Sequence, residues 1–194
     1  MGGLFILSFL ILHFLLIHDD DMDINLTLDY IFLCAFTESL LTVILIMSDE
    51  GNIPVLIIYA VYLNLTSWFD YLTGYVYEVV NIVQMVVLFS VIVCEGRFDL
   101  LFMSGFIMLL IFLLFCEKIN AFEAGDREFL LISYLFFSMK AAFEQCLEIV
   151  LVVMLLGSVL FGIFRKITNK KGDSLPYTPF LTISEIIIIL FMSF

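Results

Sequence analysis

The sequence predicts an all-α fold, a polytopic integral membrane helix bundle that forms a single domain over residues 1–194. Two observations indicate it. Hydrophobic residues make up 63% of the chain and the mean hydropathy is +1.17, which leaves too little polar surface to cover a soluble domain. The apolar residues are also gathered into long runs, separated by short stretches of charge, glycine or proline.

The apolar runs predict about eight spanning helices, with six as the lower bound, because a bilayer core about 30 Å thick needs roughly 20 apolar residues per helix and fewer where the membrane thins. They cover residues 3–17, 30–47, 53–69, 75–94, 100–116, 129–139, 143–164 and 180–194. The first run has no basic residues before it and no cleavage site after it, so we interpret it as a span rather than a signal peptide. The run at 129–139 reaches Lys140 after eleven residues. It is either a half-helix or joined to the next run.

Charge limits the partners and orients the chain. The net charge is -12 with only eight Lys and Arg, which argues against nucleic acid as a partner. With eight crossings, one side carries six cations and the other side two. The first group is Lys118, Arg127, Arg165, Lys166, Lys170 and Lys171, and the second is Arg97 and Lys140. We therefore expect the first group in the cytoplasm and both termini outside.

The four cysteines give no sign of a metal site or of disulfides. Each lies alone in or beside an apolar run, with no C-x-x-C spacing and no nearby histidine. They are Cys34, Cys94, Cys116 and Cys146. We interpret them as packing residues rather than metal ligands or a disulfide set.

Carboxylates inside predicted spans are the first candidates for function, since ionisable groups are costly there. Five glutamates qualify: Glu38, Glu78, Glu144, Glu148 and Glu185. The plainest interpretation of each is a protonated or hydrogen-bonded group that faces the bundle interior. Glu144 and Glu148 share a helix face and also suggest an ion path, although like charges at that spacing repel.

Two aspartates are predicted to meet at one membrane face. Asp70 follows the third run, Asp126 precedes the sixth, and the two runs between them form one hairpin. A pair of nearby carboxyl groups does not readily ionise twice. One member can polarise a peptide carbonyl while the other activates water, as in aspartic proteases. The alternative is that both are ordinary polar residues at helix ends.

Three stretches together resemble the type IV prepilin peptidases, membrane proteases with a G-x-G-D motif. SWFDYLTGYVYEVVNI (67–82) is similar to their first active-site motif, EAGDREFLL (123–131) to their second, and LPYTPFLTI (175–183) to the Pro-rich entry to their last helix. The order matches across nearly the whole chain. Three positions depart from the pattern: Glu123 replaces the first Gly, Tyr77 a Pro, and Glu128 a Lys.

The resemblance implies an aspartic endopeptidase that removes the short basic leader of prepilin or pseudopilin proteins, in type IV pilus assembly or protein secretion. It implies Asp70 and Asp126 as catalytic residues, Gly125 as a residue that shapes the site backbone, and a bacterial or archaeal cytoplasmic membrane with the site on its cytoplasmic side. Longer members insert a domain with paired C-x-x-C motifs, associated with N-methylation, where this chain has only residues 18–29. We expect proteolysis without methyltransferase activity, and the resemblance implies that no metal or organic cofactor is required.

The acidic loop at 18–29 suggests a way to attract the substrate. Asp19, Asp20, Asp21 and Asp23 fall on the predicted cytoplasmic side, where they would attract a basic leader, or simply keep the loop in water.

The alternatives to a peptidase are a small polytopic transporter or channel that uses the glutamates, and a non-catalytic membrane assembly factor. Presenilin-like proteases match less well, because Phe69 stands where they have Tyr.

Overall fold

The computed structural model describes residues 53–74, 76, 78–119, 121–168 and 176–192, and this part of the chain is helical, with no strand. Its six helices are α3 (Ile53–Thr73), α4 (Glu78–Cys94), α5 (Leu100–Lys118), α6 (Ala124–Ser138), α7 (Phe143–Thr168) and α8 (Thr178–Met192). They correspond in order to the last six predicted runs. The runs at 3–17 and 30–47 lie outside the described residues.

Local signals set several helix boundaries. Pro54 lies in the first turn of α3, where its missing N–H leaves no hydrogen bond unmade. Gly74 ends the helix with a φ of 77°, which favours glycine, and its N–H donates to the Asp70 carbonyl at 2.8 Å. Asp99 caps α5, accepting a 2.7 Å hydrogen bond from the Phe102 N–H. The connections between α3, α4, α5, α6 and α7 are short, so each helix is followed by a neighbour in the same bundle.

Three described helices are long and apolar enough to cross a membrane: Ile53–Tyr71, Leu100–Lys118 and Glu144–Ile167. Glu78–Cys94 and Thr178–Phe191 are apolar but shorter. The chain therefore has the character of a membrane protein, while the number of about eight spans stays a prediction. The segment around 129–139 is a separate helix, not joined to its neighbour. It begins five residues earlier than predicted, at Ala124.

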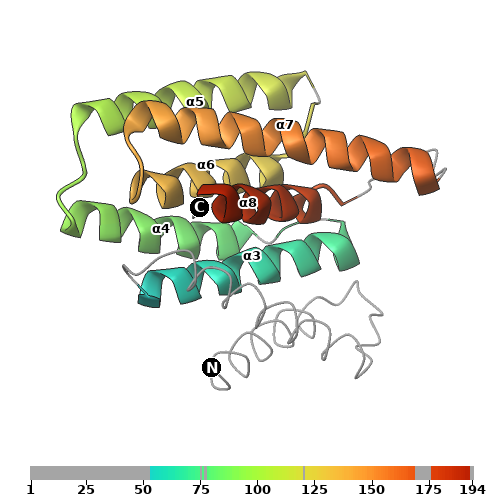
Figure 1. Cartoon of the computed structure of the whole chain (residues 1–194), viewed down its shortest axis with the longest axis horizontal. Coiled ribbons are helices and arrows are strands. Elements are labelled where there is room, and N and C mark those ends of the chain that lie inside the picture. The colour runs from blue at the N-terminus through green and yellow to red at the C-terminus, as the bar shows by residue number, and fades with distance from the viewer. Residues whose placement is uncertain (1–52, 75, 77, 120, 169–175, 193–194) are drawn as a thin grey trace.

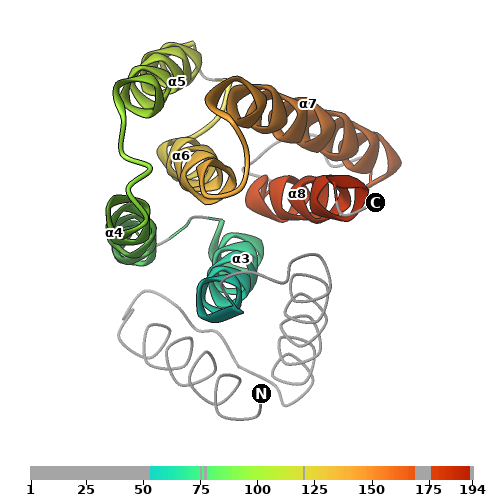
Figure 2. The same ribbon diagram turned by 60° about the vertical axis from the view of Figure 1, so that its left-hand side comes forward.

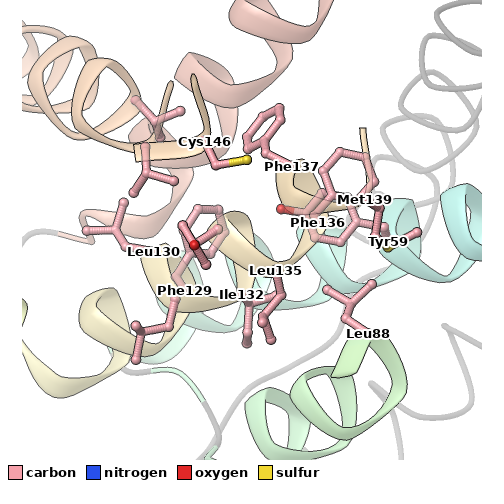
Figure 3. Close-up of a cluster of buried hydrophobic side chains, with 14 of the residues drawn as sticks. Tyr59, Leu88, Phe129, Leu130, Ile132, Leu135, Phe136, Phe137, Met139 and Cys146 are labelled. Atoms are coloured by element: carbon pink, nitrogen blue, oxygen red, sulfur yellow. The ribbon is translucent and has the colours of Figure 1, made fainter. Parts of the chain in front are cut away.

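The short helix α6 is the centre of the bundle. It packs against α4, α5, α7 and α8 (Figures 1 and 2), and every residue from Phe129 to Phe137 is buried. Figure 3 shows the surrounding helices contributing Tyr59, Leu88 and Cys146 to this core. A helix that is buried all round lacks a polar face. By contrast α5 and α7 expose many large apolar side chains, as expected of a surface that faces lipid.

Consecutive helices run in opposite directions (Figure 1). The last turns of α3, α5 and α7 therefore share one end of the bundle with the first turns of α4, α6 and α8. We call this the aspartate end, because it holds Asp70 and Asp126. Lys118, Arg127, Arg165 and Lys166 lie at this end. Arg97 and Lys140 follow the opposite ends of α4 and α6, and Lys170 and Lys171 lie outside the described residues.

Gly157 lets α7 approach α8 closely. A Cβ atom added there would lie 2.9 Å from Leu181 Cδ2 and 3.5 Å from the Leu181 Cα. Leu181 is fully buried, so it has little room to move away.

We predict that Gly157→Leu forces α7 and α8 apart and lowers the free energy of unfolding by about 1–3 kcal/mol. Thermal unfolding in detergent measures this as a fall of roughly 2–4 °C per kcal/mol. Gly162→Leu on the same helix is the control, because an added Cβ there meets nothing within 4 Å. Equal shifts in the two variants would show that the close packing at Gly157 is unimportant.

Candidate active site

Asp70 lies in the last turn of α3 and is buried. Its Oδ2 accepts a 2.7 Å hydrogen bond from the backbone N–H of Thr178. Thr178 is the first residue of α8, so the donor is one of the N–H groups that a helix start leaves without a partner in the helix. The beginning of α8 thus points at the carboxylate on α3.

Asp126 lies in the first turn of α6 and is also buried. Its Oδ1 lies 3.3 Å from the Thr178 hydroxyl, which donates to it, and its Oδ2 accepts from the backbone N–H of Glu123 at 3.1 Å. The structure therefore brings both sequence-predicted aspartates to the same residue, which itself has no exposed surface. Three helices, α3, α6 and α8, meet at this point.

The electrostatic surroundings suit negative charge only in part. The first turns of α6 and α8 present backbone N–H groups and the positive ends of their dipoles to the pair. Within the described residues, no Lys or Arg forms an ion pair with either aspartate. Because both carboxyl groups are buried and bond to the same threonine, it is unfavourable for both to be ionised at once. Such a pair can exchange protons with a bound reactant.

Sequence reasoning did not single out Thr178 or Tyr177. The Tyr177 hydroxyl lies 2.7 Å from Ser158 Oγ and 3.2 Å from the Met154 carbonyl oxygen, so it ties the start of α8 to α7. Both residues belong to the LPYTPFLTI stretch, which forms the entry to the last helix: Tyr177 directly precedes α8, and α8 begins at Thr178. A hydroxyl or backbone N–H in such a stretch has no periodicity that would mark it. The one feature of the sequence that could have pointed to these two residues is the predicted position of the stretch at the same end of the bundle as the aspartates.

Gly125 allows close contact between α6 and the chain that joins α3 to α4. A Cβ atom at Gly125 would lie 3.3 Å from Val76 Cβ, which is tight. Glu123 has a φ of -92° and a ψ of 170°, an extended conformation open to any residue, so glycine is not required there. Glu128 turns to α4, where it accepts a 2.8 Å hydrogen bond from Asn81. With both residues in place, Asp70 and Asp126 bond to Thr178. Tyr77, the third departure from the motif, lies outside the described residues.

The predicted glutamates have different positions. Glu185 is fully buried and bonds to Tyr59 and Ser133. Glu78, Glu144 and Glu148 are exposed, so the expectation that they face the interior is wrong. The reason is that helix rotation is poorly specified where nearly every neighbour is apolar. Glu38 lies outside the described residues.

The remaining candidates add no second site in the described part of the chain. Cys116 and Cys146 are free and buried, whereas Cys94 is free and exposed. No group of three or more His, Cys, Asp or Glu among the described residues is placed to hold a metal ion. Cys34 and the acidic loop with Asp19, Asp20, Asp21 and Asp23 lie outside those residues.

Comparison of the chain with protein-family models, with curated proteins and with solved structures finds no match. The resemblance to prepilin peptidases therefore rests on the three motif stretches.

We predict that Thr178→Val destabilises the protein by about 1–3 kcal/mol, because it removes the hydroxyl that bonds Asp126 while keeping the shape of the side chain. Thermal unfolding in detergent measures the change. Thr178→Ser keeps the hydroxyl and serves as the control, with a melting temperature near that of the wild type. If Val and Ser behave alike, the hydrogen bond to Asp126 does not contribute to stability.

Proposed function

We propose that this chain is a membrane aspartyl endopeptidase of the prepilin peptidase kind, with Asp70 and Asp126 as its catalytic pair. The observation that carries the proposal is that both carboxyl groups bond to Thr178, although they lie on separate helices and far apart in sequence. The motif resemblance points to the same two aspartates on the basis of sequence alone. The two lines of reasoning support one another.

The pair supplies the acid and the base of peptide hydrolysis. The ionised carboxylate takes a proton from water as the water oxygen attacks the peptide carbonyl carbon, and the protonated carboxyl donates its proton to the carbonyl oxygen. The tetrahedral intermediate then breaks its C–N bond as the leaving nitrogen receives the proton that was taken from water, and the other carboxylate takes back a proton from the diol, which restores the pair. The two roles belong to the pair as a unit. No metal or organic cofactor takes part in this scheme.

The proposed substrate is a prepilin or pseudopilin, in which a short basic leader precedes a long apolar helix. The catalytic pair lies at one end of a bundle whose sides are apolar, which suits a scissile bond at the membrane surface. Four of the six described Lys and Arg residues gather at the aspartate end, which favours the cytoplasmic side of a bacterial or archaeal membrane. The partners are then the substrate protein and the lipid bilayer. N-methylation is not part of the proposed activity.

The described residues give little support to the alternative that the chain is a transporter. Glu78, Glu144 and Glu148 are exposed and do not line a path through the bundle. A non-catalytic assembly factor is separated from a peptidase by the first experiment below, because it would tolerate loss of both aspartates.

We predict that Asp70→Asn and Asp126→Asn each reduce leader removal at least about 1,000-fold, as expected when a paired catalytic group is lost. Co-expression with a panel of prepilins, followed by mass measurement of the product, tests this. Asp99→Asn is the matched control, since it makes the same chemical change at the opposite end and keeps a side chain able to cap α5. Cleavage by both site variants at the wild-type rate would rule out the aspartyl mechanism.

We also predict a bell-shaped dependence of kcat/KM on pH. Activity rises about tenfold per pH unit as the first carboxyl of the pair ionises, and falls at the same slope when the pair loses its remaining proton. Initial rates with purified protein and a synthetic prepilin peptide give the profile. A kcat/KM that does not change with pH would argue against a shared proton.

A further inference from the structure

Glu185 is the buried carboxyl group that the proposed mechanism does not use. It lies in α8, has 0% exposure, and its bonding partners are two neutral hydroxyl groups. Of the glutamates that the structure describes, it alone is buried. A carboxyl group inside an apolar bundle is costly unless its hydrogen bonds are satisfied, so its presence calls for a role.

The two oxygens of Glu185 reach two different helices. Oε1 accepts a hydrogen bond from the Tyr59 hydroxyl on α3, and Oε2 lies 3.2 Å from Ser133 Oγ on α6. These are the helices that carry Asp70 and Asp126. Glu185 therefore joins α8 to α3 and α6 inside the core, just as Thr178 joins the same three helices at the site.

Thr178 and Glu185 also belong to one polar stripe on α8. Thr178, Thr182 and Glu185 follow at spacings of four and three residues, which places them on one helix face. Each bonds to α3: Thr178 to Asp70, Thr182 to Ser67 at 2.7 Å, and Glu185 to Tyr59. We call these three contacts the α3–α8 seam. A slip of α8 by one turn, about 5.4 Å, would break all of them.

We propose that Glu185 is a positioning residue, which fixes the register of α8 against α3 and α6 and so keeps Thr178 on the two aspartates. Its carboxyl group touches neither aspartate, and it acts through the helix. The consequence for catalysis rests on the proposed function, whereas the register of α8 does not.

The register is tested directly by a disulfide between α3 and α8. Ser67 Oγ and Thr182 Oγ1 are 2.7 Å apart, so cysteines at these positions have their sulfur atoms within bonding reach. The double variant S67C/T182C is made in full-length protein in which Cys34, Cys94, Cys116 and Cys146 are replaced by alanine. The rate of disulfide formation under mild oxidation is then measured with and without changes at position 185.

We expect Glu185→Leu to slow disulfide formation about tenfold, because it removes both hydrogen bonds at once and frees α8 to move. Glu185→Gln keeps the size and polarity of the side chain and restores a rate near that of the parent. Ser184→Ala is the matched control, since it removes a buried hydroxyl of α8 whose one hydrogen bond within the described residues goes to the Phe180 carbonyl of its own helix. An undiminished rate in Glu185→Leu overturns the positioning role, whether or not the protein cleaves prepilins.

The kinetic readout uses protein with native residues at 67 and 182. We expect Glu185→Leu to lower kcat for leader removal about 100-fold, the loss that misplacement by about 1 Å produces. KM changes by less than about threefold, and Glu185→Gln rescues kcat. A slowed disulfide with no cleavage by the wild type would leave the register role standing and remove the proposed peptidase. A normal kcat in Glu185→Leu removes the positioning role alone.

A second variant covers the case in which Glu185→Leu fails to fold. Tyr59→Phe removes only the hydroxyl that bonds Glu185 and keeps the ring stacked on Phe136, whose centroid is 3.8 Å away. We expect disulfide formation in this variant to slow by about threefold, as one of the two hydrogen bonds is lost. A rate equal to that of the parent overturns the proposal.

Discussion

Thr178 holds two carboxyl groups from different helices in one buried place, and much of the bundle serves to bring these three residues together. Its backbone N–H and its hydroxyl point to Asp70 and Asp126 respectively. Such an arrangement requires α3, α6 and α8 to be fixed in both rotation and translation. The central position of α6, which is buried from Phe129 to Phe137, holds one of these helices in place by packing against its neighbours.

The polar contacts of α8 fix its position along the helix axis. Tyr177 ties its first turn to α7, Gly157 lets α7 pack closely against it, and the α3–α8 seam sets its register. In an apolar interior each unsatisfied polar group costs free energy, so a register that pairs them is strongly preferred over one that does not. Hydrogen bonding thus supplies the specificity that dispersion contacts between apolar helices do not give.

Apolar runs and their punctuation predicted the six described helices in the right order, and counting crossings placed Asp70 and Asp126 at one end. The boundaries were less accurate. The start of α6 was missed because EAGDRE has the composition of a loop, although acidic residues are favourable in a first turn. Glu144 and Glu148 marked one face of α7, but the sequence did not say whether that face turns to the bundle interior or away from it. The role of Thr178 had no sequence signal, since a single hydroxyl forms no pattern.

The central claim is that Asp70 and Asp126 act as one catalytic unit, and a double-mutant cycle measures this most directly. Leader removal by purified protein in lipid vesicles is followed by mass for the wild type, the two Asp→Asn variants and the double variant. Residues that act as a unit are strongly non-additive. We predict that the double variant is no slower than either single variant. Losses that multiply, or a single variant that cleaves as fast as the wild type, would contradict the pairing of the two aspartates.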